Sequence, residues 1–403
     1  MKAGWERKRL SELLQKTGTT DPTKEPEKPF NYIDVSSVSN ETFKITETSK
    51  LLGKDAPSRA RRSVRSGDVI FATIRPTLKR IAIVPHELDS AVCSTGYFVL
   101  RGGPKIDNAY LFYWLFSGEF EAEMEARQKG ASYPAVNDSD IRDQYMPVPS
   151  LDEQRRIIAV LDKAFAGIAT ATANAQKNLT NARALFESYL RSVFDAPNAD
   201  WQRSTLGKLT SKIGSGATPR GGKDAYKADG TPLIRSMNVH DRYFKDRNLA
   251  FIDDNQARLL NNVIVQESDV LLNITGASVA RCCLAPEDMS GARVNQHVAI
   301  IRTNADKIRP GFLELALTSP HYKDILLGVG EKGGSTRQAI TKAEIQTLEV
   351  AFPALIDQDS FVDHATELQV ETRKLATIVS QKLAALTELK QSLLHKAFAG
   401  ELT

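Results

Sequence analysis

Short apolar runs recur along most of the chain and are separated by clusters of Gly, Pro, Asn and Asp. Examples are VIFATI from Val69, YFVL from Tyr97, VLLNIT from Val270 and HVAIIR from His297. Such runs, rich in β-branched and aromatic residues, predict short strands joined by turns. We therefore expect two β-rich globular segments, with one helix inside each, at residues 110–127 and 312–327.

Each globular segment is followed by a stretch in which apolar residues recur at alternating steps of three and four. This 3.5-residue repeat predicts a coiled coil, in which the apolar seam of one helix packs against another helix. The alternative is two unrelated amphipathic helices, each packed on its own domain, but the matched lengths of the stretches favour packing against each other. The chain returns between them through a globular domain, which permits an antiparallel pair. The expected seam is Ile158, Leu161, Phe165, Ile168, Thr172, Ala175, Leu179, Ala182, Phe186, Tyr189 and Val193 in the first stretch, and Ala365, Leu368, Thr372, Leu375, Val379, Lys382, Leu386, Leu389 and Leu393 in the second.

The chain also repeats one long template. GASYPAVNDSDIRDQYMPVPSLDEQ, from Gly130, aligns with GSTRQAITKAEIQTLEVAFPALIDQ, from Gly334. The period of about 200 residues is that of a whole domain, so the chain is a tandem duplication. An antiparallel helix pair would then relate the two copies by a pseudo-two-fold axis. Aligned pairs along the chain include Trp5/Trp201, Leu10/Leu206, Asp68/Asp269, Arg101/Arg302, Ala135/Ala339 and Gln154/Gln358.

Together these patterns predict an α+β fold, with two β-rich globular domains separated by two long helices that form an antiparallel coiled coil. Proline-marked junctions, VPSL at Val148 and FPAL at Phe352, precede the two helical stretches. We expect globular domains at 1–150 and 198–353, a central helical spacer at 151–197 and a C-terminal helical spacer at 354–403.

Composition adds limits on the class of protein. The 403 residues are 41% hydrophobic and 25% charged, as in ordinary globular domains. Cys93, Cys282 and Cys283 do not make a disulfide framework, which favours a reducing compartment. The N-terminus has no apolar leader, and no run approaches the roughly 20 apolar residues of a membrane span. We expect a soluble, cytoplasmic protein with no membrane partner.

The net charge of +4 decides little, but the basic residues are unevenly distributed. Between residues 59 and 80 the only acid is Asp68, among Arg59, Arg61, Arg62, Arg65, Arg75, Lys79 and Arg80. Such a cluster suits a polyanion, and the alternative is a solvated basic face.

Catalytic and metal-binding motifs are missing from the sequence. The six histidines are scattered, without HExxH or a Cys/His spacing fit for zinc, and no GxSxG elbow occurs. The match Gly328–Val–Gly–Glu–Lys–Gly333 follows a predicted helix, whereas a dinucleotide fingerprint follows a strand. No Asn/Asp-Pro-Pro-aromatic motif of amino-methyltransferases is present. We therefore expect a binding protein, not an enzyme, with no catalytic residues, metal or cofactor of its own.

Several motifs taken in order resemble those of one family. They are GSGATPR from Gly214, SDVLLNITG from Ser268, NQHVAIIR from Asn295, GSTRQAIT from Gly334 and LKQSLLHKAFAGELT from Leu389. With the duplicated layout, this series resembles the DNA-specificity (S) subunit of type I restriction–modification enzymes over essentially the full chain. The first copy departs from it, with TGTTDPTKE in place of GSGATPR.

The resemblance implies a division of labour. Each globular domain would be a target recognition domain that reads one half of a bipartite DNA site, and the helices would act as spacer and as docking platform. Two modification (methyltransferase) subunits would carry S-adenosylmethionine, and restriction subunits would use ATP and magnesium. The duplication would then supply two readers at a fixed separation.

Candidate DNA contacts follow from residue type and loop position. Arg, Lys, Asn, Gln and Thr can read base edges or fix register on phosphates. In the first reader we select Arg75, Lys79 and Arg80, and as a second choice Ser132 and Tyr133; in the second reader we select Arg220, Lys223, Arg235, Asn238, Asn273, Thr275, Thr336, Arg337 and Gln338. Because the candidate loops differ between copies while other positions match, we expect an asymmetric target with unlike half-sites.

Two other classes of function stay open at this point. A stand-alone methyltransferase or nuclease would need the motifs that are missing here. A coiled-coil scaffold whose duplicated domains bind proteins would have weak affinity for duplex DNA and would not discriminate sequence.

Overall fold

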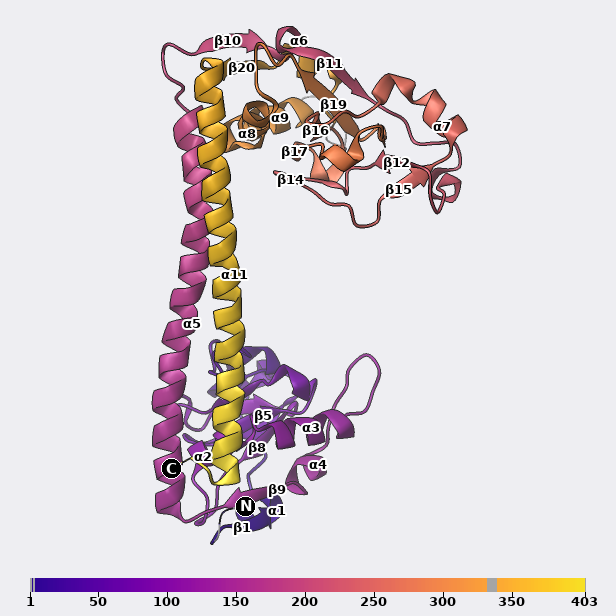
Figure 1. The fold of residues 1–403 in the computed structure, drawn as a ribbon. Coiled ribbons are helices and arrows are strands. Elements are labelled where there is room, and N and C mark those ends of the chain that lie inside the picture. Colours follow the sequence, from indigo (N-terminus) through magenta and orange to yellow (C-terminus); the bar gives the residue numbers. More distant parts are fainter. Residues whose placement is uncertain (1, 3, 332–338, 403) are drawn as a thin grey trace. The chain divides into compact units, whose positions relative to one another are not determined.

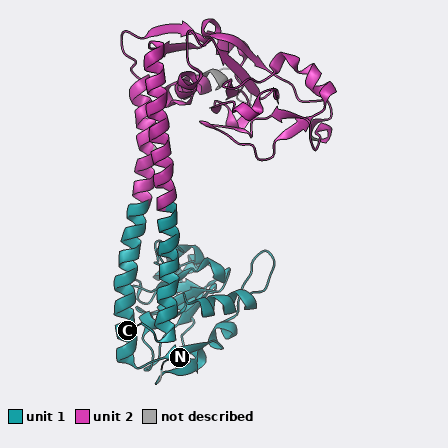
Figure 2. Ribbon diagram, viewed as in Figure 1, with its two compact units in different colours: residues 1–175, 380–403 teal, residues 176–379 magenta. Residues whose placement is uncertain are grey.

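The computed structural model describes residues 2, 4–331 and 339–402, and it divides into two compact units. Unit 1 comprises residues 1–175 and 380–403, and unit 2 comprises residues 176–379 (Figure 2). Each unit holds one β-rich globular part and a segment of each of two long helices, α5 (Leu151–Phe194) and α11 (Leu355–Ala399) (Figure 1). The two helices are therefore shared between the units.

The globular part of unit 1 is built from short strands. They are β1 (Glu6–Arg9), β2 (Pro29–Ile33), β3 (Ser49–Leu52), β4 (Ala60–Ser63), β5 (Val69–Ala72), β6 (Ile81–Ile83), β7 (Val92–Ser94), β8 (Tyr97–Leu100) and β9 (Tyr145–Val148). They form sheets of order β3-β2-β7-β4 and β6-β5-β8, and β1 pairs with β9. The runs from Val69 and Tyr97 are strands, as predicted, and the structure shows that they pair with each other.

Unit 2 repeats this plan. Its strands are β10 (Gln202–Thr205), β11 (Thr210–Ser215), β12 (Thr231–Ile234), β13 (Val239–His240), β14 (Tyr243–Phe244), β15 (Ala250–Ile252), β16 (Val270–Asn273), β17 (Cys282–Leu284), β18 (Arg293–Val294), β19 (Val298–Thr303) and β20 (Glu349–Phe352). The sheets have the orders β11-β19-β16-β17 and β15-β12-β18, with pairs β13-β14 and β10-β20. Each unit contains a parallel strand pair at the equivalent place, β2 with β7 in unit 1 and β12 with β18 in unit 2. The predicted duplication is confirmed.

A buried ion pair recurs at the same place in each copy. Arg101 donates to both carboxylate oxygens of Asp68, at 2.7 and 2.6 Å, and Arg302 does so to Asp269, at 2.8 Å for each bond. Each aspartate also accepts a backbone N–H from the turn before it. Two-bond arginine–carboxylate pairs fix geometry as well as charge, so they set the turn from which β5 and β16 begin.

The single helix expected in each globular segment is two helices. In unit 1, α2 (Asn108–Trp114) is followed by α3 (Gly118–Arg127), and in unit 2, α8 (Pro310–Thr318) is followed by α9 (Pro320–Glu331). Ser117 and Ser319 are extended at the breaks. A serine hydroxyl can cap a new helix, and Ser117 accepts the N–H of Phe120 in this way. The other short helices are α1 (Leu10–Leu13), α4 (Asp138–Arg142), α6 (Leu206–Leu209), α7 (Asp254–Leu259) and α10 (Lys342–Thr347).

A buried glutamine fastens the start of each long helix to its globular part. Gln154 accepts the N–H of Asp107 at 2.8 Å and donates to the carbonyls of Lys105 and Pro149, both at 2.9 Å. Gln358 repeats these contacts in unit 2, accepting the N–H of Arg309 at 2.8 Å. This is a physical reason for the glutamine that ends both copies of the repeated template.

Helices α5 and α11 pack together within each unit. In unit 2, Tyr189 donates to the carbonyl of Phe361 at 3.4 Å, and its ring lies against His364. In unit 1, Phe165 of α5 contacts Lys390 of α11, while earlier α5 residues share a core cluster with later α11 residues. The pair is therefore antiparallel, as predicted.

The predicted seam holds for α5 and is partly wrong for α11. Every expected seam residue of α5 is buried or half-buried. On α11, Leu375, Lys382 and Leu389 are exposed, and their C-terminal neighbours Ala376, Leu383 and Lys390 face inward instead. These three seam positions lie one residue later than predicted. Hydrophobicity favours leucine over alanine at 375 and over lysine at 389, whereas at 382 a strict alternation of three and four residues selects Lys382 in place of Leu383.

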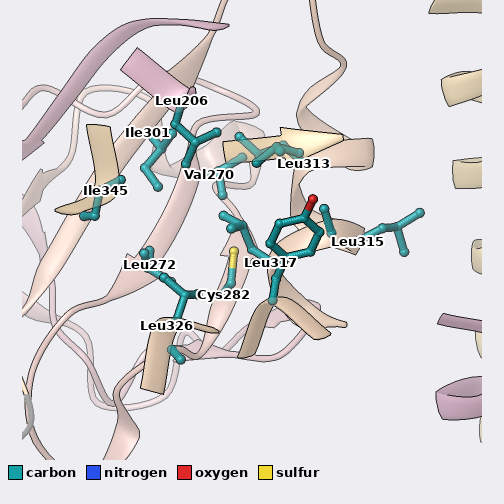
Figure 3. Close-up of a cluster of buried hydrophobic side chains, with 14 of the residues drawn as sticks. Leu206, Val270, Leu272, Cys282, Ile301, Leu313, Leu315, Leu317, Leu326 and Ile345 are labelled. Atoms are coloured by element: carbon teal, nitrogen blue, oxygen red, sulfur yellow. The ribbon is translucent and has the colours of Figure 1, made fainter. Parts of the chain in front are cut away.

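The core of unit 2 shows how its globular part is joined to the helices. Residues of β16, β17, β19, α8, α9 and α10 form one apolar cluster (Figure 3). Leu190 and Phe194 of α5 and Ala365 of α11 belong to the same cluster. The helix ends are therefore part of the domain core, and burial of apolar area fixes them there.

Two sequence expectations concern the chain's environment. The three cysteines are free and buried, and the sequence predicted that they do not form a disulfide framework. Helix α5, however, is long and apolar enough by length and composition alone to cross a membrane, contrary to our reading of the apolar runs. The alanines in AGIATATANA, from Ala166, raise its hydropathy without large side chains, so this is weak evidence for a span.

Candidate nucleic-acid interface

The basic candidates of unit 1 lie in the loop between β5 and β6. Arg75 and Lys79 have left-handed backbone, with φ of 50° and 53°, on either side of the turn η4 (Pro76–Leu78). Such φ values are strained for residues with a Cβ atom, so surrounding contacts must impose the shape of this loop.

The equivalent loop of unit 2 lies between β16 and β17 and has the same shape. Its left-handed residues are Gly276 and Ala280, with φ of 78° and 65°, around the turn η8 (Gly276–Ser278). The backbone is thus kept while the side chains change: glycine stands where unit 1 has Arg75.

The repeated template anchors both loops. Ile74 forms an isolated β-bridge with Ala135, and Thr275 forms one with Ala339. The two alanines are aligned in the repeat, so this part of the template holds the loop in each copy.

In unit 1 the first and second choices from the sequence meet in one exposed cluster. The guanidinium of Arg75 lies over the Tyr133 ring, 5.0 Å from its centre, and donates to the Ser132 carbonyl at 3.4 Å. The Tyr133 residue is 71% exposed. An exposed guanidinium stacked on an aromatic ring offers both hydrogen bonds and a flat surface to a nucleic acid.

Lys79 and Arg80 have partners inside the protein. Lys79 pairs with Glu121 of α3 at 2.7 Å. Arg80 donates to the carbonyls of Val35, Ser36 and Val38 at 3.2, 3.3 and 2.8 Å. Arg75 is therefore the strongest of the three candidates, because the other two would have to give up these contacts to bind DNA.

The prediction that Asn238 and Asn273 contact DNA is wrong, because both are fully buried. Asn238 accepts the N–H of Arg235 and donates to the Lys245 carbonyl at 2.8 Å. Asn273 donates to the Ser236 carbonyl at 2.9 Å. Their amides hold backbone turns in place, and a sequence motif alone does not separate this use from base reading.

Arg235 is half-buried and partly engaged. Its guanidinium donates to the Asn248 carbonyl at 2.5 Å and lies 5.2 Å from the Tyr226 ring centre. Like Arg75 it is an arginine stacked on a tyrosine, but its contacts bind it more firmly to its own domain.

Thr275 lines a surface hollow of about 740 Å³ in unit 2. The described residues around it come from the turn after β12, the β16–β17 loop, the turn before β19 and the repeated template: Ser236, Met237, Thr275, Gly276, Ala277, Ser278, Arg281, Gln296, His297 and Ala339. Of the candidates chosen from the sequence, Thr275 alone belongs to this set.

A chain of polar side chains crosses one wall of the hollow. The Thr218 hydroxyl donates to the Gln296 side-chain carbonyl, the Gln296 amide contacts His297 Nε2 at 3.0 Å, and His297 Nδ1 contacts Thr275. The neighbouring loop must come close to β18, since a Cβ at Gly216 would lie 1.8 Å from the Val294 carbonyl oxygen. Glycine at that position lets the loop that carries Thr218 approach the wall.

Sequence reasoning missed Arg281, Gln296, His297 and Met237. A signal was present, because the aligned segments of the two copies placed Arg281 opposite Arg80 and His297 opposite Gly96. His297 opposite Gly96 is a position where the shared fold carries unlike side chains, and two readers would differ at such positions.

The remaining candidates are less well placed. Arg220 is exposed in the loop after β11. The Lys223 side chain and Thr336, Arg337 and Gln338 lie outside the described part of the chain. They stay predictions.

Comparisons with known proteins agree on one family. Residues 2–181 match a family model described as "Type I restriction modification DNA specificity domain". The HindI specificity subunit of Haemophilus influenzae is 27% identical over 161 residues, which are 39% of this chain and 35% of that protein. The matched segment therefore spans about a third of that relative.

Two solved structures match along the whole chain. A chain from the structure described as "Structural basis underlying complex assembly and conformational transition of the type I R-M system" is 30% identical, with TM-score 0.85 and coverage of 100% of this chain and 99% of that one. The HsdS subunit from Thermoanaerobacter tengcongensis is 29% identical, with TM-score 0.68 and coverage of 100% and 98%. With both copies, both long helices and the repeated template accounted for, the chain belongs to the DNA-specificity subunits of type I restriction–modification systems.

Proposed function

We propose that each globular part of this chain reads one half of a bipartite DNA target, and that the two half-sites differ in sequence. The observation that carries the proposal is a shared backbone with unlike side chains at one pair of loops. Arg75 stands where unit 2 has Gly276, and Gly96 stands where unit 2 has His297. A duplication that kept its strands and ion pairs but changed these positions suits two readers with different targets.

The chain supplies specificity, and the chemistry belongs to its partners. By the family role, two modification subunits hold S-adenosylmethionine and methylate adenine, and restriction subunits use ATP and magnesium to cleave. The antiparallel helices α5 and α11 serve as spacer and docking platform for these subunits. The complex acts in the cytoplasm, where its DNA target is accessible.

Arginine and lysine contacts to phosphates should make binding depend on salt. Displaced counterions make the logarithm of affinity fall linearly with the logarithm of salt concentration, with a slope of about −0.9 per phosphate contacted. A coiled-coil scaffold that binds proteins would show no such slope on duplex DNA. Membership of this family does not favour that scaffold alternative.

The test is methylome sequencing of cells that express the chain with its cognate modification subunits. We expect a bipartite, asymmetric methylated motif that disappears when this chain is deleted. Methylation that is unchanged by the deletion would overturn the proposal, and two identical half-sites would overturn the claim of asymmetry.

A further inference from the structure

The turn after the first parallel strand is equivalent in the two units. Ile33 pairs with Cys93 across the parallel strands, and Ile234 pairs with Val294 in the same way. Residues 34–38 therefore correspond to residues 235–239. The N–H of Asp34 donates to the Ser37 hydroxyl at 3.0 Å, and that of Arg235 donates to the Asn238 side chain at 3.0 Å. The correspondence thus extends to individual hydrogen bonds.

In unit 1 this turn is held from outside by Arg80 and Tyr97. Arg80 donates to the Val35 and Val38 carbonyls at 3.2 and 2.8 Å, and the Tyr97 hydroxyl donates to Val35 at 3.1 Å. Buried carbonyls need such donors, since folding removes the water that would otherwise bond to them. Arg80 therefore stabilises the domain itself.

In unit 2 a different residue satisfies the equivalent carbonyls. The Asn273 amide donates to Ser236 at 2.9 Å and to Val239 at 3.4 Å. Unit 1 has Ala72 at the position of Asn273, and unit 2 has Val298 at the position of Tyr97, as the strand pairings show. The turn carbonyls that an arginine and a tyrosine satisfy in unit 1 are therefore satisfied by a single asparagine in unit 2.

This substitution leaves the arginine of unit 2 without that role. Arg281 is the counterpart of Arg80, because its carbonyl accepts the N–H of Asn273 as the Arg80 carbonyl accepts the N–H of Ala72. Among the described residues, no hydrogen bond or ion pair holds the Arg281 guanidinium. It lines the hollow, where it is the only described side chain with a permanent charge.

The space around one pair of equivalent residues, His297 and Gly96, differs between the two units. His297 lines the hollow, whereas the equivalent Gly96 sits so close to Val35 that an added Cβ would lie 2.6 Å from that side chain. The same fold therefore leaves room for a side chain at this position in unit 2 and none at the equivalent position in unit 1.

We propose that Arg281 reads a guanine in the half-site contacted by unit 2, with Gln296 and His297 forming the wall beside it. Arginine bonding to O6 and N7 of guanine is the commonest specific contact in the major groove. The inference rests on the proposed function and adds to it a specificity-determining residue. It assigns different roles to two aligned arginines: Arg281 reads the DNA sequence, and Arg80 stabilises its own domain.

The test uses the complex of the full chain with its modification subunits. The wild-type motif is first read from the methylome, and the complex is then offered duplexes changed at one position at a time. For Arg281→Ala we expect discrimination to fall about 5-fold to 150-fold at one guanine of one half-site, with the other half-site and the spacing unchanged. Arg281→Lys should relax the same position, because lysine keeps the charge but loses the two-bond fork.

Arg80→Ala is the matched control. It should lower the unfolding temperature of the chain and leave the discrimination of unit 2 at each position unchanged, while Arg281→Ala leaves the unfolding temperature unchanged. An unchanged motif in both Arg281 variants, or relaxation at a base other than guanine, overturns the inference. A wild-type complex that methylates no bipartite site would overturn the proposed function instead, so the two failures are distinguishable.

Discussion

The ammonium nitrogen of Lys390 lies 4.6 Å from the centre of the Phe43 ring. The rings of Phe165 and Phe116 lie 5.2 and 5.9 Å from the same nitrogen. Phe43 belongs to the globular part of unit 1 and has left-handed backbone, with φ of 55°, while Lys390 belongs to α11. A cation–π contact therefore joins the globular part to the long helix at the tip of one loop.

Unit 2 makes the corresponding contact with the partners exchanged. Arg242, also left-handed with φ of 61°, lies over the Phe186 ring of α5, 5.6 Å from its centre. Its guanidinium donates to the Gln369 side chain of α11 at 3.1 Å. The globular part supplies the aromatic ring in unit 1 and the cation in unit 2. The same kind of contact therefore joins the globular part to a long helix in both units, through different residues.

Lys390→Ala should weaken the attachment of the unit 1 globular part to α11. Its cation–π contacts are partly desolvated, so we expect the free energy of unfolding to fall by about 1–2 kcal/mol. The exposed Lys396 on the same helix is the control, and Lys396→Ala should change it by less than about 0.5 kcal/mol. Chemical denaturation of both variants measures the difference. Equal effects would mean that the phenylalanine rings contribute nothing specific.

The buried pair of Arg242 and Glu314 predicts a pH dependence. Burial raises the pKa of Glu314 above its usual 4.5, although the nearby Arg242 acts in the opposite direction, and burial also lowers the pKa of Arg242. Because the folded state holds the Glu314 proton more tightly than the unfolded state, stability from this group is present at low pH. It is lost as pH rises from 4.5 through the raised pKa.

Glu314→Gln removes this titration. The stability of the wild type relative to this variant should therefore decline as pH rises from 4.5, while Glu367→Gln, at an exposed position of α11, leaves the wild-type profile unchanged. Thermal unfolding across the pH range measures both differences. A wild-type advantage that grew with pH over this window would contradict the direction inferred for Glu314.

The two buried glutamines should contribute equally to their units. Gln154→Ala would leave the Asp107 N–H and two carbonyls without partners, which costs about 1–3 kcal/mol in the free energy of unfolding. Gln358→Ala should cost a similar amount in unit 2. Gln391→Ala, at an exposed position on α11, is the control. The rate of hydrogen exchange at the amide of Asp107 should also rise, in the Gln154→Ala variant alone. An unchanged exchange rate in that variant would show that another acceptor replaces Gln154.

Much of the fold follows from periodicity and repetition in the sequence. The strands begin where the apolar runs begin, and all the α5 seam residues are covered by other parts of the chain. The α11 seam failed at Leu389 because hydrophobicity ranks leucine above lysine, whereas Lys390 packs its stem and ammonium group among phenylalanines contributed from distant parts of the sequence. Side chains such as lysine can bury an apolar stem, and a pattern of residue types does not reveal it.

The site was harder to predict than the fold. Residue type suggested Arg75, Asn273 and Arg80 alike, yet the first is exposed, the second is buried and the third holds backbone carbonyls. The distinction depends on which carbonyls lie within reach of each side chain, and that is a property of the folded loop. Aligning the two copies pairs Arg281 with Arg80, but both are arginine, so only the contacts of each guanidinium in the folded loop separate their roles.

Arg75 and Tyr133 should act as one unit in reading the first half-site. If the stacked guanidinium contacts a base, Arg75→Ala weakens specific binding by roughly 1–3 kcal/mol. Tyr133→Phe keeps the stacking surface and should be close to neutral, while Tyr133→Ala frees the guanidinium and should resemble Arg75→Ala. In competition binding, the double variant should be no weaker than the worse single variant. Additive losses would mean that the two side chains contact DNA independently.

The helix pair should set the distance between the half-sites. Inserting seven residues into α5 within residues 170–182, with a matched insertion in α11 beside Val379, keeps the 3.5-residue seam in register. It lengthens each helix by about 10 Å at 1.5 Å per residue, which corresponds to about three base pairs at 3.4 Å per step. The methylated motif should therefore keep both half-sites and change its spacer. An insertion in α5 alone breaks the pairing, so it should change the preferred spacing or abolish assembly with the modification subunits. A matched double insertion with an unaltered spacer would mean that contacts other than the helices determine where the two readers bind.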